Sequence, residues 1–259
     1  MRVISVANQK GGVGKTTTAV NLAASLAVME RRVLLIDMDP QANSSSHLGI
    51  PEEAHVSHNV YFALIEAKPL KSLIIETRFP NLSLVPAGPD LAGAEIELVN
   101  VDRRESRFRR SIYEFSLDFD PIIIDCPPSL GLLTVNALTA SDSIIVPLQC
   151  EYLAMEGLGR LMRTVEMIRD SLNPSLDIEG ILLTMFDVRN NLAHQVEEEI
   201  RGHLGDMVFR TVIPRNVRIS ESPSFGKPVL MYAYSSKGAV KYIDFAQELM
   251  ERWGQGEMV

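Results

Sequence analysis

The fold of this chain is decided by the stretch Gln9-Lys10-Gly11-Gly12-Val13-Gly14-Lys15-Thr16-Thr17. It follows the apolar run Val3 to Val6, which predicts a strand, and it leads into a helical pattern from Thr16 to Met29. Glycines at these positions let successive backbone N–H groups face phosphate oxygens, and the N-terminus of the following helix adds positive potential. A strand, a glycine-rich loop and a helix in this order therefore predict a phosphate-binding loop.

Three side chains of this loop bear on its chemistry. Lys15 is expected to neutralise phosphate charge, and Thr16 is expected to be a ligand of Mg²⁺. The loop departs from the general GxxxxGK[ST] pattern, because Gln9 occupies the position of the first glycine and a second lysine, Lys10, follows it. Two ammonium groups on one tight loop cannot easily serve the same phosphates, so Lys10 is expected to point to solvent or to reach elsewhere.

The rest of the chain alternates short apolar runs with helical patterns. Near-continuous apolarity is typical of strands that are covered on both faces of a parallel sheet. The runs that predict strands are Val33 to Ile36, Leu82 to Val85, Ile122 to Ile124, Ile144 to Val146, Ile181 to Leu183 and Val208 to Ile213. Further helices are predicted at Leu130 to Leu138, Leu153 to Leu172 and Leu192 to Leu204. The alternation predicts an α/β fold with a doubly wound, mostly parallel sheet flanked by helices, in one domain over residues 1–259.

Composition excludes several classes of protein. With 46% hydrophobic and 22% charged residues, the chain is near the globular average, which excludes a disordered, collagen-like or coiled-coil protein. No stretch approaches the roughly eighteen unbroken apolar residues of a membrane span, and the N-terminus lacks the layout of a signal peptide, so a cytoplasmic protein is expected. The two cysteines, Cys126 and Cys150, are far apart and are expected to be buried reduced thiols.

The charge is unevenly distributed along the chain. The formal net charge is −8, yet residues 201–241 hold seven basic residues against the two acids Asp206 and Glu221. This segment predicts a basic face on an otherwise acidic body. A second basic cluster, equally well explained by a solvated helix, consists of Arg103, Arg104, Arg107, Arg109 and Arg110.

Acidic residues follow two of the predicted strands. Asp37 and Asp39 lie at and just beyond the end of the run Val33 to Ile36, and Asp125 follows Ile122 to Ile124 directly. Ligands of open α/β sheets bind at the carboxyl ends of the strands. These carboxylates are therefore expected beside the bound phosphates.

Residues Lys10 to Thr17 match the motif KGGxGK[ST]T, and the chain thereby resembles the deviant Walker A ATPases, which include ParA/Soj partition proteins and MinD. The resemblance implies a P-loop NTPase fold with ATP and Mg²⁺ as cofactors. It implies that Asp39 orients or deprotonates the attacking water, that Asp125 holds the metal through water, and that Lys10 crosses an ATP-sandwich homodimer to the partner's nucleotide. The implied nucleotide-binding residues of the loop are Lys10, Gly11, Gly12, Val13, Gly14, Lys15, Thr16 and Thr17, and the implied catalytic residues are Lys10, Lys15 and Asp39.

Later segments resemble chromosomal ParA (Soj) proteins more than MinD. They are 147–152, 184–189, 213–218 and 221–228. The resemblance implies that Pro214 and Asn216 contact adenine, that the dimer binds double-stranded DNA without sequence preference on the nucleoid, and that a ParB-type partner releases it by stimulating a weak ATPase. The residues implied or expected to bind DNA are Arg189, Arg218, Lys227 and Lys241.

Two other functions stay open at this point. A MinD-like membrane-associated positioning ATPase needs a basic C-terminal amphipathic helix, but the polar face here carries Asp244, Glu248 and Glu251, so no membrane partner is expected. The apolar stripe of that helix predicts core packing instead, and it consists of Val240, Ile243, Ala246, Leu249, Met250 and Trp253. An iron–sulfur reductase on the same scaffold would need a cysteine context that Cys126 and Cys150 lack.

Overall fold

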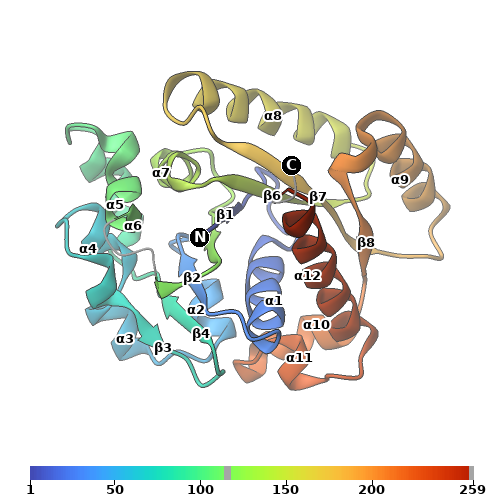
Figure 1. Cartoon of the computed structure of the whole chain (residues 1–259), viewed down its shortest axis with the longest axis horizontal. Helices are drawn as coiled ribbons and strands as arrows, with labels where there is room; N and C mark the ends of the chain where they lie inside the picture. The colour runs from blue at the N-terminus through green and yellow to red at the C-terminus, as the bar shows by residue number, and fades with distance from the viewer. Residues whose placement is uncertain (114–117, 257–259) are drawn as a thin grey trace.

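The chain forms one eight-stranded sheet in a computed structural model that describes residues 1–113 and 118–256 (Figure 1). The strand order is β3-β4-β2-β5-β1-β6-β7-β8, and every neighbouring pair is parallel except β3 and β4. The strands are β1 Val3–Val6, β2 Val33–Asp37, β3 Ile75–Glu76, β4 Leu82–Val85, β5 Ile122–Asp125, β6 Ser143–Gln149, β7 Asp177–Phe186 and β8 Val208–Pro214. The predicted doubly wound, mostly parallel sheet is confirmed.

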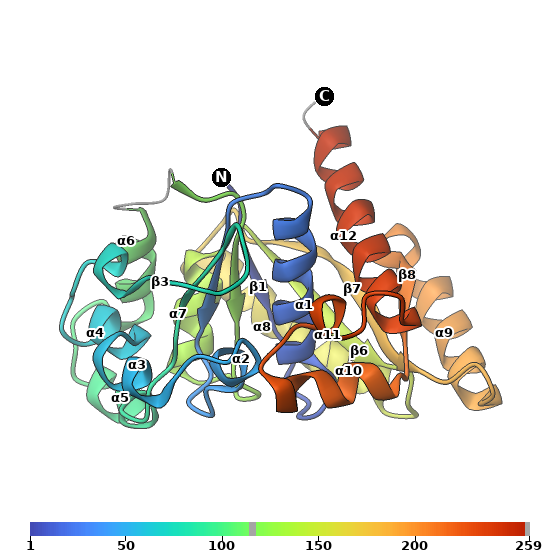
Figure 2. The ribbon, with the colours of Figure 1, turned by 90° about the horizontal axis from the view of Figure 1, so that it is seen from below.

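Helices cover both faces of the sheet (Figures 1 and 2). The α-helices are α1 Lys15–Val28, α2 Asn43–His47, α3 Glu52–Ser57, α4 Val60–Leu64, α5 Leu91–Leu98, α6 Arg107–Tyr113, α7 Leu132–Ala140, α8 Ala154–Ser171, α9 Asn191–Leu204, α10 Val217–Glu221, α11 Val229–Tyr232 and α12 Lys237–Gly256. Short 3₁₀ turns are η1 Leu70–Leu73, η2 Arg104–Ser106, η4 Gly205–Met207 and η5 Ser222–Phe225. Among the described residues, no helix is both long enough and apolar enough to cross a bilayer.

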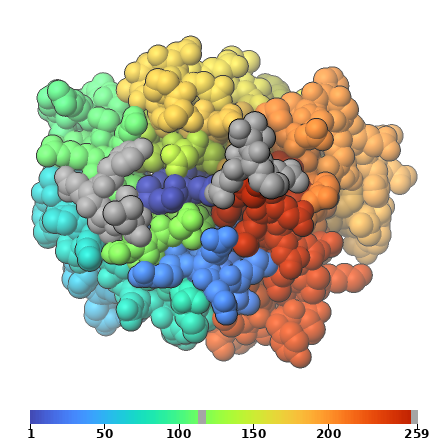
Figure 3. Space-filling model, in the orientation of Figure 1, coloured from blue at the N-terminus to red at the C-terminus, as the bar shows by residue number. Residues whose placement is uncertain are grey.

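The central strands are buried on both faces because their side chains alternate between two apolar cores. In β5, Ile122 and Ile124 join the core beneath α4 to α9, whereas Ile123 joins the core beneath α1 and α12. All three side chains are fully buried. Helices α1 and α12 cover the core that contains Ile123. Figure 3 shows the red surface of α12 next to the blue surface of the α1 region.

The four predicted helices and seven predicted strands agree with the structure within a few residues at their ends. The two-residue antiparallel strand β3 was not predicted, because Ile75 and Glu76 carry no apolar periodicity of strand length. The stripe of α12 packs as expected at Ala246, Leu249 and Trp253, but the prediction was wrong for Val240, which is 45% exposed near the start of the helix. Tyr242 and Phe245 occupy the buried face there instead.

The carboxyl ends of the parallel strands meet at one edge of the sheet. Figure 2 shows α2 and α10 along this edge, with both termini at the opposite edge. The loop between β1 and α1 lies at the same edge, because β1 runs parallel to β5 and β6 and the loop follows its carboxyl end. Every candidate residue discussed below for the nucleotide follows a strand end or begins a helix here.

A close contact between two glycines joins α2 to η5 at this edge. A Cβ atom on Gly226 would lie 2.7 Å from the Gly49 Cα, and Gly226 has φ +59°. We expect Gly226→Ala to lower the free energy of unfolding by about 1–3 kcal/mol, because it combines overpacking with a left-handed backbone. Denaturant unfolding of the full chain measures this.

The matched control is Gly202→Ala in α9, where the added Cβ would meet nothing within 4 Å. This helical substitution is expected to stabilise the protein by about 0.5–1 kcal/mol. Equal effects of the two substitutions would contradict the close contact at Gly226.

Candidate nucleotide-binding site

The loop from Lys10 to Thr17 forms a hollow at the N-terminus of α1. Gly12 and Gly14 have φ values of +76° and +89°, a left-handed conformation that glycine adopts without strain. Val13 is fully buried, and its carbonyl accepts a hydrogen bond from the Thr184 hydroxyl of β7 at 2.8 Å. The loop is therefore anchored to the sheet at β7. The N-terminus of α1 borders a cavity of about 330 Å³. This cavity is lined by Gly11, Gly12, Gly14, Lys15, Thr16, Thr17, Asp39, Gln41, Asn43, Pro128 and Met185.

The two lysines of the loop lie in different environments. Lys15 is only 7% exposed, and its Nζ donates to the Lys10 carbonyl at 3.2 Å, so its side chain curls back over the loop. Burial lowers the pKa of Lys15, and the nearby charges of Asp125 and Asp39 oppose that shift. Lys10 extends the other way and forms an ion pair with Glu151, which follows β6. This arrangement agrees with the expectation that Lys10 reaches away from the phosphate site of its own loop.

Asp37 and Asp125 are register partners at the ends of β2 and β5, and both are fully buried. Burial raises the pKa of each carboxyl group, and a neighbouring charge adds to the effect, that of Asp37 for Asp125 and that of Asp39 for Asp37. Two consecutive serines of α2 offset part of this cost. The Ser44 hydroxyl donates to Asp125 Oδ2 at 2.8 Å, and the Ser45 hydroxyl and backbone N–H donate to Asp37 Oδ2 at 2.7 and 2.9 Å.

Asp125 Oδ1 is buried and accepts no hydrogen bond of good geometry among the described residues. The Thr16 hydroxyl lies beside this carboxyl group and, because it is a hydrogen-bond donor, lowers the pKa of Asp125. Asp39 is 7% exposed and lines the cavity of the loop. Its Oδ1 accepts from the Gln41 backbone N–H at 3.0 Å, which fixes the turn into α2.

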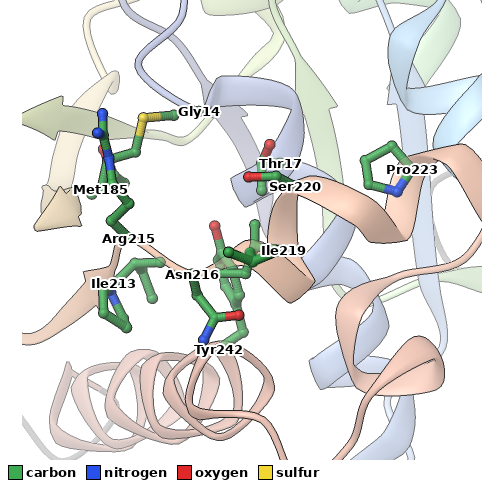
Figure 4. Close-up of a pocket in the computed structure, with 13 residues that line it drawn as sticks. Gly14, Thr17, Met185, Ile213, Arg215, Asn216, Ile219, Ser220, Pro223 and Tyr242 are labelled. Atoms are coloured by element: carbon green, nitrogen blue, oxygen red, sulfur yellow. The ribbon is translucent and has the colours of Figure 1, made fainter.

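A second cavity of about 530 Å³ adjoins the first and shares Gly14, Thr17 and Met185 with it. Pro214 and Asn216 line it, as do Thr184, Ile213, Arg215, Val217, Ile219, Ser220, Pro223 and Tyr242. Figure 4 shows Met185 beside Gly14 on one side and Asn216 above α12, the helix that carries Tyr242. Asn216 also accepts the Arg218 backbone N–H at 2.9 Å and so caps α10.

Met185 has φ +51°, an uncommon conformation for a non-glycine residue. It lies where the phosphate loop meets this second cavity. This position could not be predicted from the sequence, because a methionine in an apolar strand is typical of a core residue. Backbone strain of this kind is concentrated at functional sites.

The four residues predicted to bind DNA come from separate elements, and three of them have acidic partners. Arg189 pairs with Asp187 at 3.0 Å and lowers the pKa of that carboxyl to about 2. Arg218 pairs with Glu221 at 2.8 Å, and Lys241 pairs with Asp244 at 2.7 Å. Lys227 is exposed. The basic segment 201–241 is therefore more neutralised than its count of charges indicated, since Asp244, Glu248 and Glu251, which pair with Lys241 and Arg210, lie outside it in sequence.

Several arginines of the second basic cluster, residues 103–110, form hydrogen bonds that stabilise the fold. Arg104 donates to the Val99 carbonyl, Arg107 to the Leu64 and Ile65 carbonyls, and Arg109 to the Leu172 carbonyl. These bonds tie α6 and η2 to neighbouring elements. Both cysteines are buried, which raises the pKa of Cys126 to about 12 and that of Cys150 to about 11.

The parallel sheet and the glycine loop at its carboxyl edge define a P-loop NTPase. A family model described as an AAA domain matches residues 1–178. The chromosome partitioning protein ParA of Myxococcus xanthus is 56% identical over 97% of this chain and 88% of its own length. The sporulation initiation inhibitor protein Soj of Bacillus subtilis is 54% identical over 96% of this chain and 98% of its own.

A solved structure shows the same fold. Cobyrinic acid a,c-diamide synthase from Mycobacterium smegmatis, with bound ADP and magnesium, has a TM-score of 0.85 and 38% identity over 99% of this chain and 96% of its own. The chain belongs to the ParA/Soj family of chromosome-partitioning proteins. The predicted cofactors, ATP and Mg²⁺, agree with the nucleotide and metal found in this solved relative.

The buried carboxyl pair predicts how stability depends on pH when metal is removed. Because burial raises the pKa of Asp37 and Asp125 above their unfolded values, the native state binds more protons than the unfolded state as the pH rises past the unfolded pKa. Stability is therefore lost as the pH rises from about 4, near the unfolded pKa, to about 8, near the raised native values. Asp37→Asn removes one of the two charges.

In EDTA, the free energy of unfolding of Asp37→Asn relative to the unsubstituted chain is expected to rise by at least ~1 kcal/mol over this range. Urea unfolding at several pH values measures the difference. A difference that stays constant or shrinks with pH would contradict the assignment of raised pKa values to this pair.

Proposed function

We propose that this chain is a single-domain partitioning ATPase over residues 1–259, which hydrolyses ATP to ADP and phosphate with Mg²⁺ at a weak intrinsic rate. In this proposal ATP forms a sandwich homodimer that binds double-stranded DNA without sequence preference, and a ParB-type partner releases it. The observation that carries the proposal is the buried Asp125 Oδ1, which lies beside the phosphate loop and, among the described residues, accepts no hydrogen bond of good geometry. A buried carboxylate oxygen without a donor fits a hydrated cation.

The donor set at this point suits Mg²⁺, which prefers oxygen ligands and retains several waters. Thr16 would bind the ion directly, and Asp125 would bind it through water. Bound there, the ion would neutralise charge on the transferring phosphoryl group. The fully buried carboxyl pair supports this assignment, because the described residues that offset its negative charge are hydroxyl and backbone N–H donors and a single cation, Lys15.

The chain's own groups can perform the remaining tasks of phosphoryl transfer. The N–H groups of the loop and the Lys15 ammonium would hold phosphate oxygens. Asp39 lines the same cavity on a turn fixed by the Gln41 N–H, so it is placed to orient or deprotonate a water. Pro214 and Asn216 would contact adenine in the adjoining cavity.

Lys10 supports the dimer. Its side chain is 43% exposed and leaves the phosphate cavity to Lys15, and its ion pair with the half-exposed Glu151 lies at the surface, where a second subunit could take the place of that partner. Its partner Glu151 is followed by Tyr152 and Leu153, which are 84% and 60% exposed. Exposed apolar side chains beside a catalytic loop are typical of a surface that another protein covers. In the dimer, Lys10 would act on the partner's nucleotide.

DNA binding would use the exposed basic residues Arg189, Arg218, Lys227 and Lys241, and would place the protein on the nucleoid in the cytoplasm. Such binding is dominated by phosphate contacts and falls steeply with salt. A MinD-like membrane role is the competing proposal. It has less support, because Ala246, Leu249 and Trp253 of α12 are packed in the core and are not available to a lipid surface.

Asp39→Ala gives the most direct test of this function. We expect the variant to bind ATP, hydrolyse it at least about tenfold more slowly, and stay dimeric, because the water loses its positioning group. Loaded with ATP and Mg²⁺, it should co-sediment with plasmid DNA of unrelated sequence in a salt-sensitive way and should not co-sediment with anionic liposomes. Lys15→Ala, which should lose ATP binding, is the negative control.

Binding of Asp39→Ala to liposomes alone would replace the proposal with the membrane-associated one. Binding to neither surface would remove the DNA-binding part of the proposal. A monomer in ATP by light scattering would contradict the role of Asp39.

Arg218→Glu tests the basic surface separately. Reversing this charge beside Glu221 should weaken DNA binding at least about tenfold, because a phosphate contact becomes a repulsion, while ATP-dependent dimerisation persists. Fluorescence anisotropy with labelled duplex DNA measures the change. The control is Arg163→Glu on the exposed face of α8, with the same change of charge. Equal effects of the two variants would mean that the DNA surface lies elsewhere.

A further inference from the structure

Three consecutive serines of α2 use their hydroxyl groups in three different ways. Ser46 donates to the Ala42 carbonyl of its own helix at 3.0 Å, which is the ordinary bond of a helical serine. Ser45 donates to Asp37, and Ser44 donates across to Asp125 on β5. Ser44 and Ser45 are fully buried, whereas Ser46 is exposed. The bond of Ser44 is therefore a specific tertiary contact.

This contact determines which oxygen of Asp125 is free. Ser44 donates to Oδ2, whereas Oδ1 is buried and accepts no hydrogen bond of good geometry from the part of the chain that the structure describes. A carboxylate with one oxygen held by a fixed donor cannot rotate to exchange its two oxygens without breaking that bond. Ser44 thus fixes Asp125 so that its second oxygen stays available.

The backbone before α2 supports the same arrangement. Ala42, which precedes the helix, has φ +52°, an unusual conformation for a residue with a side chain. Its N–H donates to the Asp39 carbonyl at 2.8 Å, so the turn that carries Asp39 is continuous with the helix that carries Ser44. The position of Ser44 is therefore coupled to the position of the residue proposed to act on water.

We propose that Ser44 is a positioning residue for the metal site, which holds Asp125 through Oδ2 and ties the Asp39 turn to it. It touches neither nucleotide nor metal itself. The inference rests on the Mg²⁺–ATP binding proposed above. Loss of its hydroxyl should reduce the increase in ATP affinity that Mg²⁺ causes, while the affinity for ATP without metal stays nearly unchanged.

The test measures the affinity of the full chain for a fluorescent ATP analogue, once with Mg²⁺ and once with EDTA, and takes the ratio. Ser44→Ala should reduce this ratio by roughly tenfold, the size expected for a lost hydrogen bond to a charged group. Ser44→Cys keeps the size of the side chain with a weaker donor and should give an intermediate reduction, which provides a test if Ser44→Ala does not fold. Ser46→Ala is the matched control and should leave the ratio unchanged.

An unchanged ratio in Ser44→Ala or Ser44→Cys, with normal thermal stability, would overturn the role of Ser44. Equal reductions in the Ser44 and Ser46 variants would also overturn it, since they would reflect a general loss of α2. Absence of any Mg²⁺ effect in the unsubstituted chain would overturn the proposed function itself, and this inference with it. The two failures are thus distinguished by the unsubstituted chain.

Discussion

The pairing of β2 with β5 places two carboxylates, Asp37 and Asp125, side by side in the interior of the protein. Ionised carboxyl groups without partners are costly to bury, so the surrounding structure must compensate them. Hydroxyl donors from α2 and the ammonium of Lys15 approach this pair from two sides. The phosphate loop, the turn at Asp39 and the helix α2 are all arranged around this one concentration of negative charge.

The topology brings these groups together without long connections. Because β1 lies between β5 and β6, the loop that follows it ends beside Asp125, and α1 starts at Lys15 with its positive end toward the same space. β7 and β8 extend the sheet on the other side and supply the second cavity. Two adjoining cavities therefore lie side by side at this edge, one at the phosphate loop and one lined by Pro214 and Asn216, as the proposed binding of phosphates and base requires.

Much of this fold could be predicted from sequence. A central strand that is buried on both faces needs apolar residues at nearly every position, and glycines followed by a lysine are typical of a phosphate-binding loop. The carboxylates were predictable because each ends such a run. The serines of α2 were not, since a polar segment after a strand does not reveal which hydroxyl turns inward. Met185 was missed because nothing in its residue type indicates a positive φ. The acidic partners of Arg210 and Lys241 were also missed, because a count over residues 201–241 ignores acids that lie just outside this window in sequence.

The two lysines of the loop are proposed to have separate tasks, Lys15 within its own subunit and Lys10 across a dimer. Molar mass by light scattering, with a non-hydrolysable ATP analogue and Mg²⁺, tests this division when calorimetric binding is measured on the same samples. We expect the 28.7 kDa chain to bind the analogue and double its mass, Lys10→Ala to bind it and stay a single chain, and Lys15→Ala not to bind it. Doubling of the mass in Lys10→Ala to the same extent as in the unsubstituted chain, or binding by Lys15→Ala with undiminished affinity, would contradict it.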